Sequence, residues 1–474
     1  MDIFKIFKIL LALTPISVFA AGGHGGAPHL DGSAENLAIY WVIPFAGILL
    51  SIAAFPLIAP DFWHHNFGKI SLFWATSLII PFVIKEGFQI TLYELLHVGL
   101  LEYVPFIILL LALFTISGGV QLKGSLVGSP TLNTAILAIG TLLASWMGTT
   151  GAAMLLIRPL IRANSHRKNK VHVIVFFIFL VANIGGALTP LGDPPLFLGF
   201  LKGVNFFWTT SAMFLPMLFL VVSLLIIFFV LDTYFFKKEN ISIEIEENPE
   251  KLGLEGAFNL LLLAGVVGGV LLSGFWKPGI SFSIYYVDVE LQNIVRDILL
   301  LGLTYASWVL TSQSIREANE YTWFPIVEVA KLFAGIFITI IPAIAILKAG
   351  TQGALSGVVA SVTSNDQPIN YMYFWMTGIL SSFLDNAPTY LVFFNTAGGD
   401  PSLLMGDLYQ TLLAISAGAV FMGANTYIGN APNFMVKSIA ETSGIEMPSF
   451  FGYLIKWSIP ILVPLFIVLT FIFF

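Results

Sequence analysis

Runs of about 20 apolar residues recur along the whole chain, and they limit the folds that it can adopt. The sequence has 474 residues, of which 57% are hydrophobic and 10% are charged, with a mean hydropathy of +0.90. Soluble domains carry roughly 25% charged residues. An apolar run of this length can cross a bilayer as a helix, so we predict an all-α membrane protein of about ten transmembrane helices. The expected spans are 38–59, 69–85, 102–120, 171–201, 207–236, 257–274, 293–313, 325–347, 410–440 and 450–474.

The first residues have the pattern of an export signal. Lys5 and Lys8 precede a short apolar core, and Val18 and Ala20 give the small-x-small pattern of a cleavage site. We therefore expect residues 1–20 to be a signal peptide, with a first transmembrane helix as the alternative. The chain has no cysteine, which excludes disulfides, thiolate metal sites and cysteine nucleophiles. We expect no nucleic-acid partner.

Two further apolar segments, 131–162 and 370–396, are interrupted midway by polar residues. Basic residues mark cytoplasmic loops, and the densest basic cluster runs from Arg158 to Lys170, with a second at Lys237 and Lys238. Both clusters can be cytoplasmic only if 131–162 is a re-entrant hairpin. With 370–396 treated as a hairpin from the other side, both ends of the mature chain lie in the periplasm, and we expect a multi-pass protein of the bacterial inner membrane.

An internal repeat relates the two ends of the chain. The stretch "GGALTPLGDPPLF" (185–197) matches "GANTYIGNAPNF" (423–434) at an offset of 237 residues, with Asp193 opposite Asn430. The same offset aligns "SWMGTTG" with "SSFLDNAP", the interruptions of the two expected hairpins. One offset that fits two separate motifs indicates a true duplication.

The expected topology gives the repeat an inverted orientation. Residues 21–236 and 257–474 would enter the membrane from opposite sides, joined by a cytoplasmic acidic linker at 237–256. Inverted repeats with broken helices are typical of secondary transporters.

Each half contributes two interruptions: a hairpin tip and an unwound span, near 185–195 in the first half and near 423–433 in the second. Unwound backbone inside a bilayer is tolerated only around a polar cavity or a bound solute, so we expect all four to meet near the midplane. Glycine permits close backbone approach, and proline ends a helix. The residues expected to shape these breaks are Gly148, Gly151, Gly186, Gly192, Pro195, Gly423, Gly429 and Pro432.

Two acids, Asp193 and Asp385, lie in these breaks. A carboxylate at membrane depth is costly, and it can hold Na⁺ when ionised and a proton when neutral. Hard cations prefer oxygen ligands. The candidate oxygen ligands beside the two acids are Ser145, Thr149, Thr150, Thr189, Ser382, Asn386, Asn425, Thr426 and Asn430. None of the breaks contains a basic residue, which disfavours a large anion, although helix dipoles and co-bound Na⁺ could substitute for one.

These motifs resemble the ion-transporter superfamily of citrate and dicarboxylate carriers, arsenite permeases and NhaD-type sodium/proton antiporters. "GGALTPLGDPP" is similar to its "GG-x-x-TP-x-G" signature, and "SSFLDNAPTY" to its "F-L-D-N-x-P" hairpin. Asp193 after glycine and Asp385 before Asn386 are most like the antiporter branch, whereas "ANTYIGNAPN" is nearer to the carboxylate and arsenite patterns. The resemblance covers nearly the whole mature chain and implies a hairpin-bearing core that moves against a scaffold, in a homodimer.

These residues raise three candidate functions. The first is antiport of Na⁺ or Li⁺ against H⁺ with Asp193 and Asp385 as carriers; the second is a Na⁺- or H⁺-coupled citrate or dicarboxylate carrier. The third, an intramembrane aspartyl protease, is disfavoured because Leu384 and Pro190 stand where that chemistry needs tyrosine and glycine. We therefore expect a transporter rather than an enzyme, with no cofactor and no metal beyond the transported ion.

Overall fold

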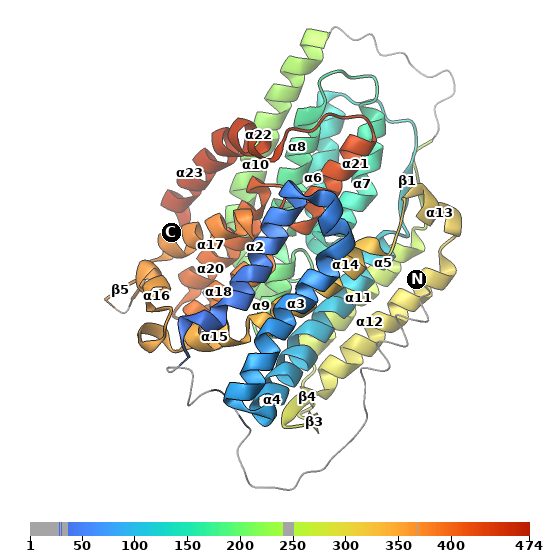
Figure 1. The fold of residues 1–474 in the computed structure, drawn as a ribbon. Coiled ribbons are helices and arrows are strands. Elements are labelled where there is room, and N and C mark those ends of the chain that lie inside the picture. Colours follow the sequence, from blue (N-terminus) through green and yellow to red (C-terminus); the bar gives the residue numbers. More distant parts are fainter. Residues whose placement is uncertain (1–27, 29, 31–36, 240–250, 366) are drawn as a thin grey trace.

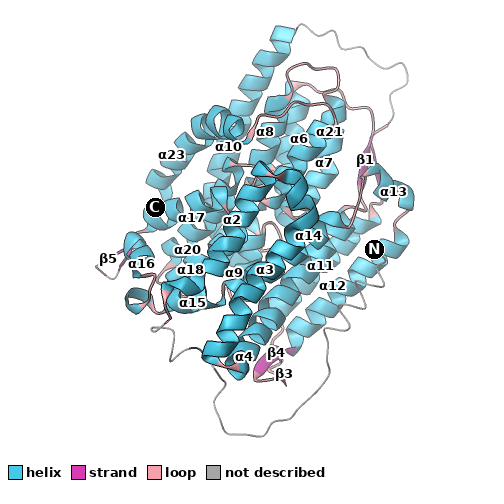
Figure 2. Cartoon of the chain, in the orientation of Figure 1, coloured by secondary structure: helices cyan, strands magenta, loops and turns pink. Residues whose placement is uncertain are grey.

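The structure is a computed structural model that describes residues 28, 30, 37–239, 251–365 and 367–474. The expected signal peptide and most of the acidic linker lie outside the described residues. Within these ranges the chain folds into long helices with very little strand, which confirms the all-α class (Figures 1 and 2).

One group of helices, here called the flanking bundle, packs side by side on one flank of the molecule (Figure 1). Its main contacts are α3 with α14 and α2, and α12 with α5 and α11. The members are η3 (Ile39–Val42), α2 (Ile43–Ile58), α3 (Pro60–Glu86), α4 (Phe88–Val98), η4 (Gly99–Tyr103), α5 (Val104–Ser117), α11 (Phe258–Phe275), α12 (Leu291–Leu310), α14 (Phe324–Thr339) and α15 (Ile341–Lys348).

The remaining long helices form a second group, the hairpin bundle, in which α17 packs along α20, and α6 along α7 and α10. Its members from the first half are α6 (Pro130–Met147), α7 (Thr149–Ala163), α8 (Val171–Leu180), η5 (Ile184–Leu188), α9 (Pro194–Leu201) and α10 (Phe206–Glu239). From the second half they are α17 (Asn370–Phe383), α18 (Asn386–Thr396), α20 (Tyr409–Met422), η7 (Gly423–Asn425), α21 (Ala431–Thr442), α22 (Phe450–Tyr453), η8 (Leu454–Leu462) and α23 (Val463–Phe473). The bundles meet where α5 contacts α7 and where α15 contacts α18.

Short elements complete the connections between helices. They are α13 (Gln313–Ala318), η6 (Gly350–Gln352), α16 (Ser356–Val362), α19 (Pro401–Met405) and three antiparallel pairs, β1 (Gln121–Lys123) with β2 (Gly253–Glu255), β3 (Ser281–Ile284) with β4 (Val287–Glu290), and β5 (Thr363–Ser364) with β6 (Gln367–Pro368). None of these strands was expected from the sequence. The β1–β2 pair joins the end of the linker to the first half, with an ion pair of 2.6 Å between Lys123 and Glu255.

Nine helices in the described part of the chain are long and apolar enough to cross a membrane, or ten if α14 and α15, bent by 42°, form one span. With this bent pair counted as the expected span 325–347, the ten differ from the expected set in two places. They include α6, an expected hairpin arm, because it is 18 residues long. They omit the expected span 410–440, because it is divided into α20 and α21 and neither part is long enough.

Both interrupted segments fold back on themselves. At the open end of the first, the Gly128 amide donates to the Ala163 carbonyl at 2.7 Å, and the side chains of Asn133 and Asn164 exchange hydrogen bonds of 2.8 and 2.9 Å. Gly148, at the tip, has φ +80°, a conformation that L side chains rarely adopt. In the second, α17 and α18 lie against each other. The depth of these hairpins in a bilayer stays a prediction.

Candidate functional site

Four helices of the hairpin bundle begin at one point. They are α7, α9, α18 and α21, one for each of the four interruptions seen in the sequence. The carboxylate of Asp193, whose residue is 1% exposed, accepts hydrogen bonds from Asn386 Nδ2 at 2.6 Å, Asn430 Nδ2 at 2.8 Å and Thr149 Oγ1 at 3.3 Å. The four breaks therefore converge on a single carboxylate.

This convergence offsets the cost of burying an acid. The first turn of a helix carries unpaired amide hydrogens and the positive end of the helix dipole, and both favour a nearby negative charge. Asp193 immediately precedes α9, and Asn430 immediately precedes α21. Three side-chain donors and the starts of four helices thus surround one buried carboxyl group.

Residues that match in the internal repeat also match in their hydrogen bonds. Asp193 and Asn430, which bond to each other, are 237 residues apart. In each half the threonine of the unwound span donates to the main-chain carbonyl of the hairpin serine: Thr189 to Ser145, and Thr426 to Ser382. Each serine hydroxyl in turn donates to a carbonyl of its unwound span, at 2.5 Å for Ser145 and 3.0 Å for Ser382. The opposite orientation of the two halves in the membrane stays a prediction.

These four hydroxyl groups have a structural role. Ser145, Thr189, Ser382 and Thr426 tie each hairpin to the unwound span beside it, and none of them lines either of the cavities described below. The structure thus separates these four predicted ligands, which hold the backbone in place, from Thr149, Thr150 and Asn430, which line the smaller cavity.

The glycines of the unwound spans are required by close backbone contact. A Cβ on Gly192 would lie 2.1 Å from the Gly186 carbonyl oxygen, and one on Gly429 would lie 2.5 Å from that of Gly423. No side chain fits at such distances without movement of the main chain. The other expected break residues lie at the hairpin tip and in first turns of helices: Gly148, Gly151, Pro195 and Pro432.

Two adjacent cavities share part of their lining beside this site, and Asp193 lines the smaller of them. The smaller, of about 110 Å³, has as its polar lining residues Thr149, Thr150, Asp193, Asp385 and Asn430, and no lysine, arginine or histidine is among the described residues around it. The larger, of about 620 Å³, shares the wall at Asp385 and Asn430 and runs between the two bundles. It reaches the surface at Glu320, whose side chain is 69% exposed.

Asp385 has a different place from Asp193. Its Oδ1 accepts a hydrogen bond of 3.1 Å from the Ala387 amide, so it caps the start of α18. It lines both cavities, and no hydrogen bond joins it to Asp193. Of the two predicted acids, Asp193 is therefore the buried centre of the site, and Asp385 lines the cavities beside it.

Among the predicted ligands, two buried amide oxygens have no hydrogen-bond partner within the described residues: Oδ1 of Asn386 and Oδ1 of Asn425. Their amide nitrogens are bonded, to Asp193 at 2.6 Å and to the Ser382 hydroxyl at 2.9 Å. An unpaired buried oxygen carries a desolvation cost, and an amide oxygen is a good ligand for a hard cation. Both oxygens could therefore serve a bound Na⁺.

Sequence reasoning missed two asparagines that join the unwound spans. Asn183 Nδ2 donates to Asn433 Oδ1 at 2.7 Å, and Asn433 Nδ2 donates to the carbonyls of Gly423 and Thr426, each at 2.9 Å. The repeat could not indicate them, because neither has an asparagine partner at the 237-residue offset.

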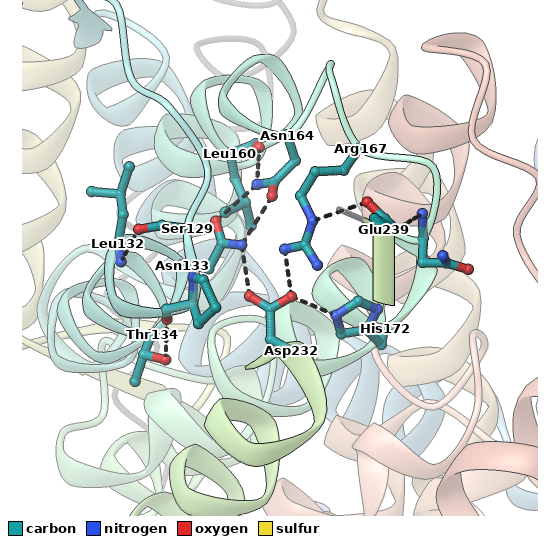
Figure 3. A network of polar contacts seen from close by, with 12 residues as sticks. Ser129, Leu132, Asn133, Thr134, Leu160, Asn164, Arg167, His172, Asp232 and Glu239 are labelled. Atoms are coloured by element: carbon teal, nitrogen blue, oxygen red, sulfur yellow. Dashed lines mark hydrogen bonds and ion pairs between the residues drawn. The ribbon is translucent and has the colours of Figure 1, made fainter. Parts of the chain in front are cut away.

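A second buried network lies at the open end of the first hairpin (Figure 3). Asp232 of α10 is fully buried and accepts hydrogen bonds from Arg167 Nη1 at 2.5 Å, His172 Nε2 at 2.7 Å and Asn133 Nδ2 at 2.9 Å. The network fixes the hairpin to α8 and α10. One sequence signal could have indicated it, since an acid inside an otherwise apolar span usually has a buried partner.

The comparison with protein families agrees with this architecture. The family model described as "Putative citrate transport" matches residues 34–474. The chain belongs to this family. No curated protein matches the chain. The family and the long apolar helices together make it a multi-pass membrane protein of a transport family, consistent with the resemblance seen in the sequence.

Proposed function

We propose that this transporter exchanges Na⁺ or Li⁺ for H⁺ by alternating access, with Asp193 as the central ion-binding carboxylate and Asp385 on the path to it. The observation that carries the proposal is the charge of the site. A buried carboxylate and a second acid face a small cavity around which the described residues include no basic side chain.

The approach to the site is also acidic. The larger cavity is lined by four acids, and its basic residues are Arg158 and His64. Arg158 is paired with Glu320 at 2.8 Å, which removes much of its attraction for an incoming anion. The remaining acids that line this cavity are Asp61, Glu328 and Asp385. Such a lining raises the local concentration of cations.

Simple electrostatics weighs against an unaccompanied citrate. Two like charges 4 Å apart repel by about 4 kcal/mol at an effective dielectric constant of about 20. Citrate would bring several carboxylates towards Asp193 and Asp385, so it needs co-bound cations to approach them. Na⁺ needs no such partner.

Carriage of citrate or a dicarboxylate together with Na⁺ or H⁺ is the second candidate. The family description favours it. The four helix starts also provide a positive field, which a substrate carboxylate could use if cations neutralised the two acids.

Purified protein in proteoliposomes distinguishes the two. We expect Na⁺ to dissipate an imposed ΔpH, with no uptake of labelled citrate or succinate under a Na⁺ gradient. Asp385→Asn should lower the Na⁺-dependent signal by about tenfold or more, as expected when a coupling carboxylate is lost. Citrate uptake by the wild-type protein, with no Na⁺-dependent change in pH, would refute antiport.

A matched control separates transport from helix capping. Asp400 caps α19 through a hydrogen bond of 2.8 Å to the Ser402 amide, but it is exposed at the surface. Asp400→Asn makes the same neutralising change at a similar helix cap, where asparagine can still accept the hydrogen bond, and it should leave transport unchanged. Equal loss of transport in both variants would mean that Asp385 acts only on stability.

We further propose that the protein lies in a bacterial inner membrane as a homodimer, with both ends of the mature chain in the periplasm. The larger cavity reaches the surface beside Arg158 and Glu320, on the side where basic residues predict the cytoplasm. The chain has no native cysteine, so Glu320→Cys provides a single thiol. A membrane-impermeant thiol reagent should label it in everted vesicles and not in intact cells, and labelling in intact cells would reverse the orientation.

A further inference from the structure

The donors around Asp193 all come from other segments of the chain. Asn386 lies at the start of α18, Asn430 precedes α21, and Thr149 lies at the start of α7. Because none of these groups belongs to the segment that carries Asp193, they form a cradle of three side-chain donors that does not depend on the Asp193 side chain.

The cradle has the properties of an anion site. Its donors lie at the starts of helices of 15, 11 and 12 residues, and α9 of 8 residues starts beside them. Convergent amide donors and positive helix ends are the usual protein partners of a carboxylate or phosphate. In this chain the anion that they hold is covalently attached.

We propose that Asp193 is a resident carboxylate that fills a carboxylate-binding cradle, and that it thereby keeps small external carboxylates out of the centre. The role in ion selectivity rests on the proposed function, whereas the existence of the cradle does not. When the side chain is shortened, the vacated cradle should bind a free carboxylate of matching size.

The surrounding backbone limits the size of that ligand. A Cβ added at Gly186 would lie 2.7 Å from Thr149 Cγ2 and 3.0 Å from Asp193 Cβ, so main chain closes the cradle on this side. Formate replaces the carboxylate that Asp193→Ala removes, and acetate replaces the whole side chain removed in Asp193→Gly.

Thermal unfolding of the purified full-length protein in detergent tests the cradle directly. We expect sodium formate to raise the Tm of Asp193→Ala by about 2 °C or more over sodium chloride at the same ionic strength. The matched control is Asp193→Asn, which is neutral but keeps the cradle filled. Formate should shift neither this variant nor the wild-type protein. A shift of Asp193→Ala no larger than that of Asp193→Asn would overturn the proposal.

An exchange of side chains between Asp193 and Asn430, which occupy matching positions in the repeat, tests the same cradle if Asp193→Ala fails to fold. Asn430→Asp alone places a second carboxylate next to that of Asp193, where a hydrogen bond of 2.8 Å now joins the two residues. Repulsion between the two carboxylates should lower the Tm. The double variant Asp193→Asn with Asn430→Asp restores a single carboxylate among the same donors. It should be more stable than Asn430→Asp alone and at least as stable as Asp193→Asn alone. A double variant less stable than both single variants would contradict a shared cradle.

Transport by the formate-treated variant then separates this proposal from the proposed function. If formate, but not chloride, restores Na⁺-dependent ΔpH dissipation in Asp193→Ala, the result supports both the cradle and antiport. Stabilisation by formate in a protein whose wild-type form carries citrate and no Na⁺-dependent proton flux supports the cradle and refutes antiport.

Discussion

Removal of the Asp232 carboxylate should destabilise the protein strongly. The side chains of Asp232 and Arg167 are fully buried, and 2.5 Å separates the Asp232 carboxylate from Arg167 Nη1. Asp232→Ala would leave Arg167 without its main counter-charge and His172 without its acceptor. Asn133 Nδ2 would lose one of its two acceptors and keep Asn164. Unlike the loss of a surface ion pair, this change creates an uncompensated charge inside the protein.

The size of the effect follows from these contacts. Breaking a buried ion pair by removing one partner costs about 3–5 kcal/mol. The two donors that lose this acceptor, on His172 and Asn133, would add about 1 kcal/mol each. Glu239, 3.9 Å from Arg167 Nε, can offset part of the unpaired charge of Arg167. The expected net loss is therefore about 4 kcal/mol. For a chain of this length that corresponds to a decrease in Tm of about 3–6 °C.

Tryptophan fluorescence during heating of the detergent-solubilised protein can measure this change, since the chain has ten tryptophans. Glu441→Ala is the control, because Glu441 forms an exposed ion pair with Lys437 worth about 1 kcal/mol or less. Replacing Arg167 by Met together with Asp232→Leu should recover part of the loss, since it removes the unpaired charge. A Tm for Asp232→Ala equal to that of Glu441→Ala would refute the reasoning.

Two further predictions concern the unwound span and the contact between bundles. Gly192→Ala should lower the Tm and transport together, because its Cβ would lie 2.1 Å from the Gly186 carbonyl oxygen; Gly302→Ala, with no atom within 4 Å of the added Cβ, should be tolerated in both assays. Buried Glu102 of the flanking bundle pairs with Lys202 at the end of α9, so Glu102→Gln should lower the Tm by an amount that Lys202→Met reproduces. Additive losses in the double variant would show that the two residues do not act as one pair.

Much of this architecture could be predicted from short stretches of sequence. A span requires only a local run of apolar residues, and its interruption requires only local glycine, proline and polar residues. The four breaks, and the offset between "GGALTPLGDPP" and "GANTYIGNAP", could therefore be recognised from the sequence alone. The same local view could not rank the candidate ligands, because it does not show which way a hydroxyl points. Ser145 and Thr189 bond to backbone, whereas Thr149 reaches the carboxylate.

The sequence by itself determined that this is a helical membrane protein, and it predicted that the broken helices are related by a repeat. Only the tertiary structure decided which groups meet. Asp193 is bonded to Asn386, 193 residues away, and to Asn430, 237 residues away, while Asp232 joins Arg167 and His172 from other helices. The physical reason is that hydropathy is a property of neighbours along the chain, whereas the compensation of a buried charge depends on donors that packing brings from distant segments.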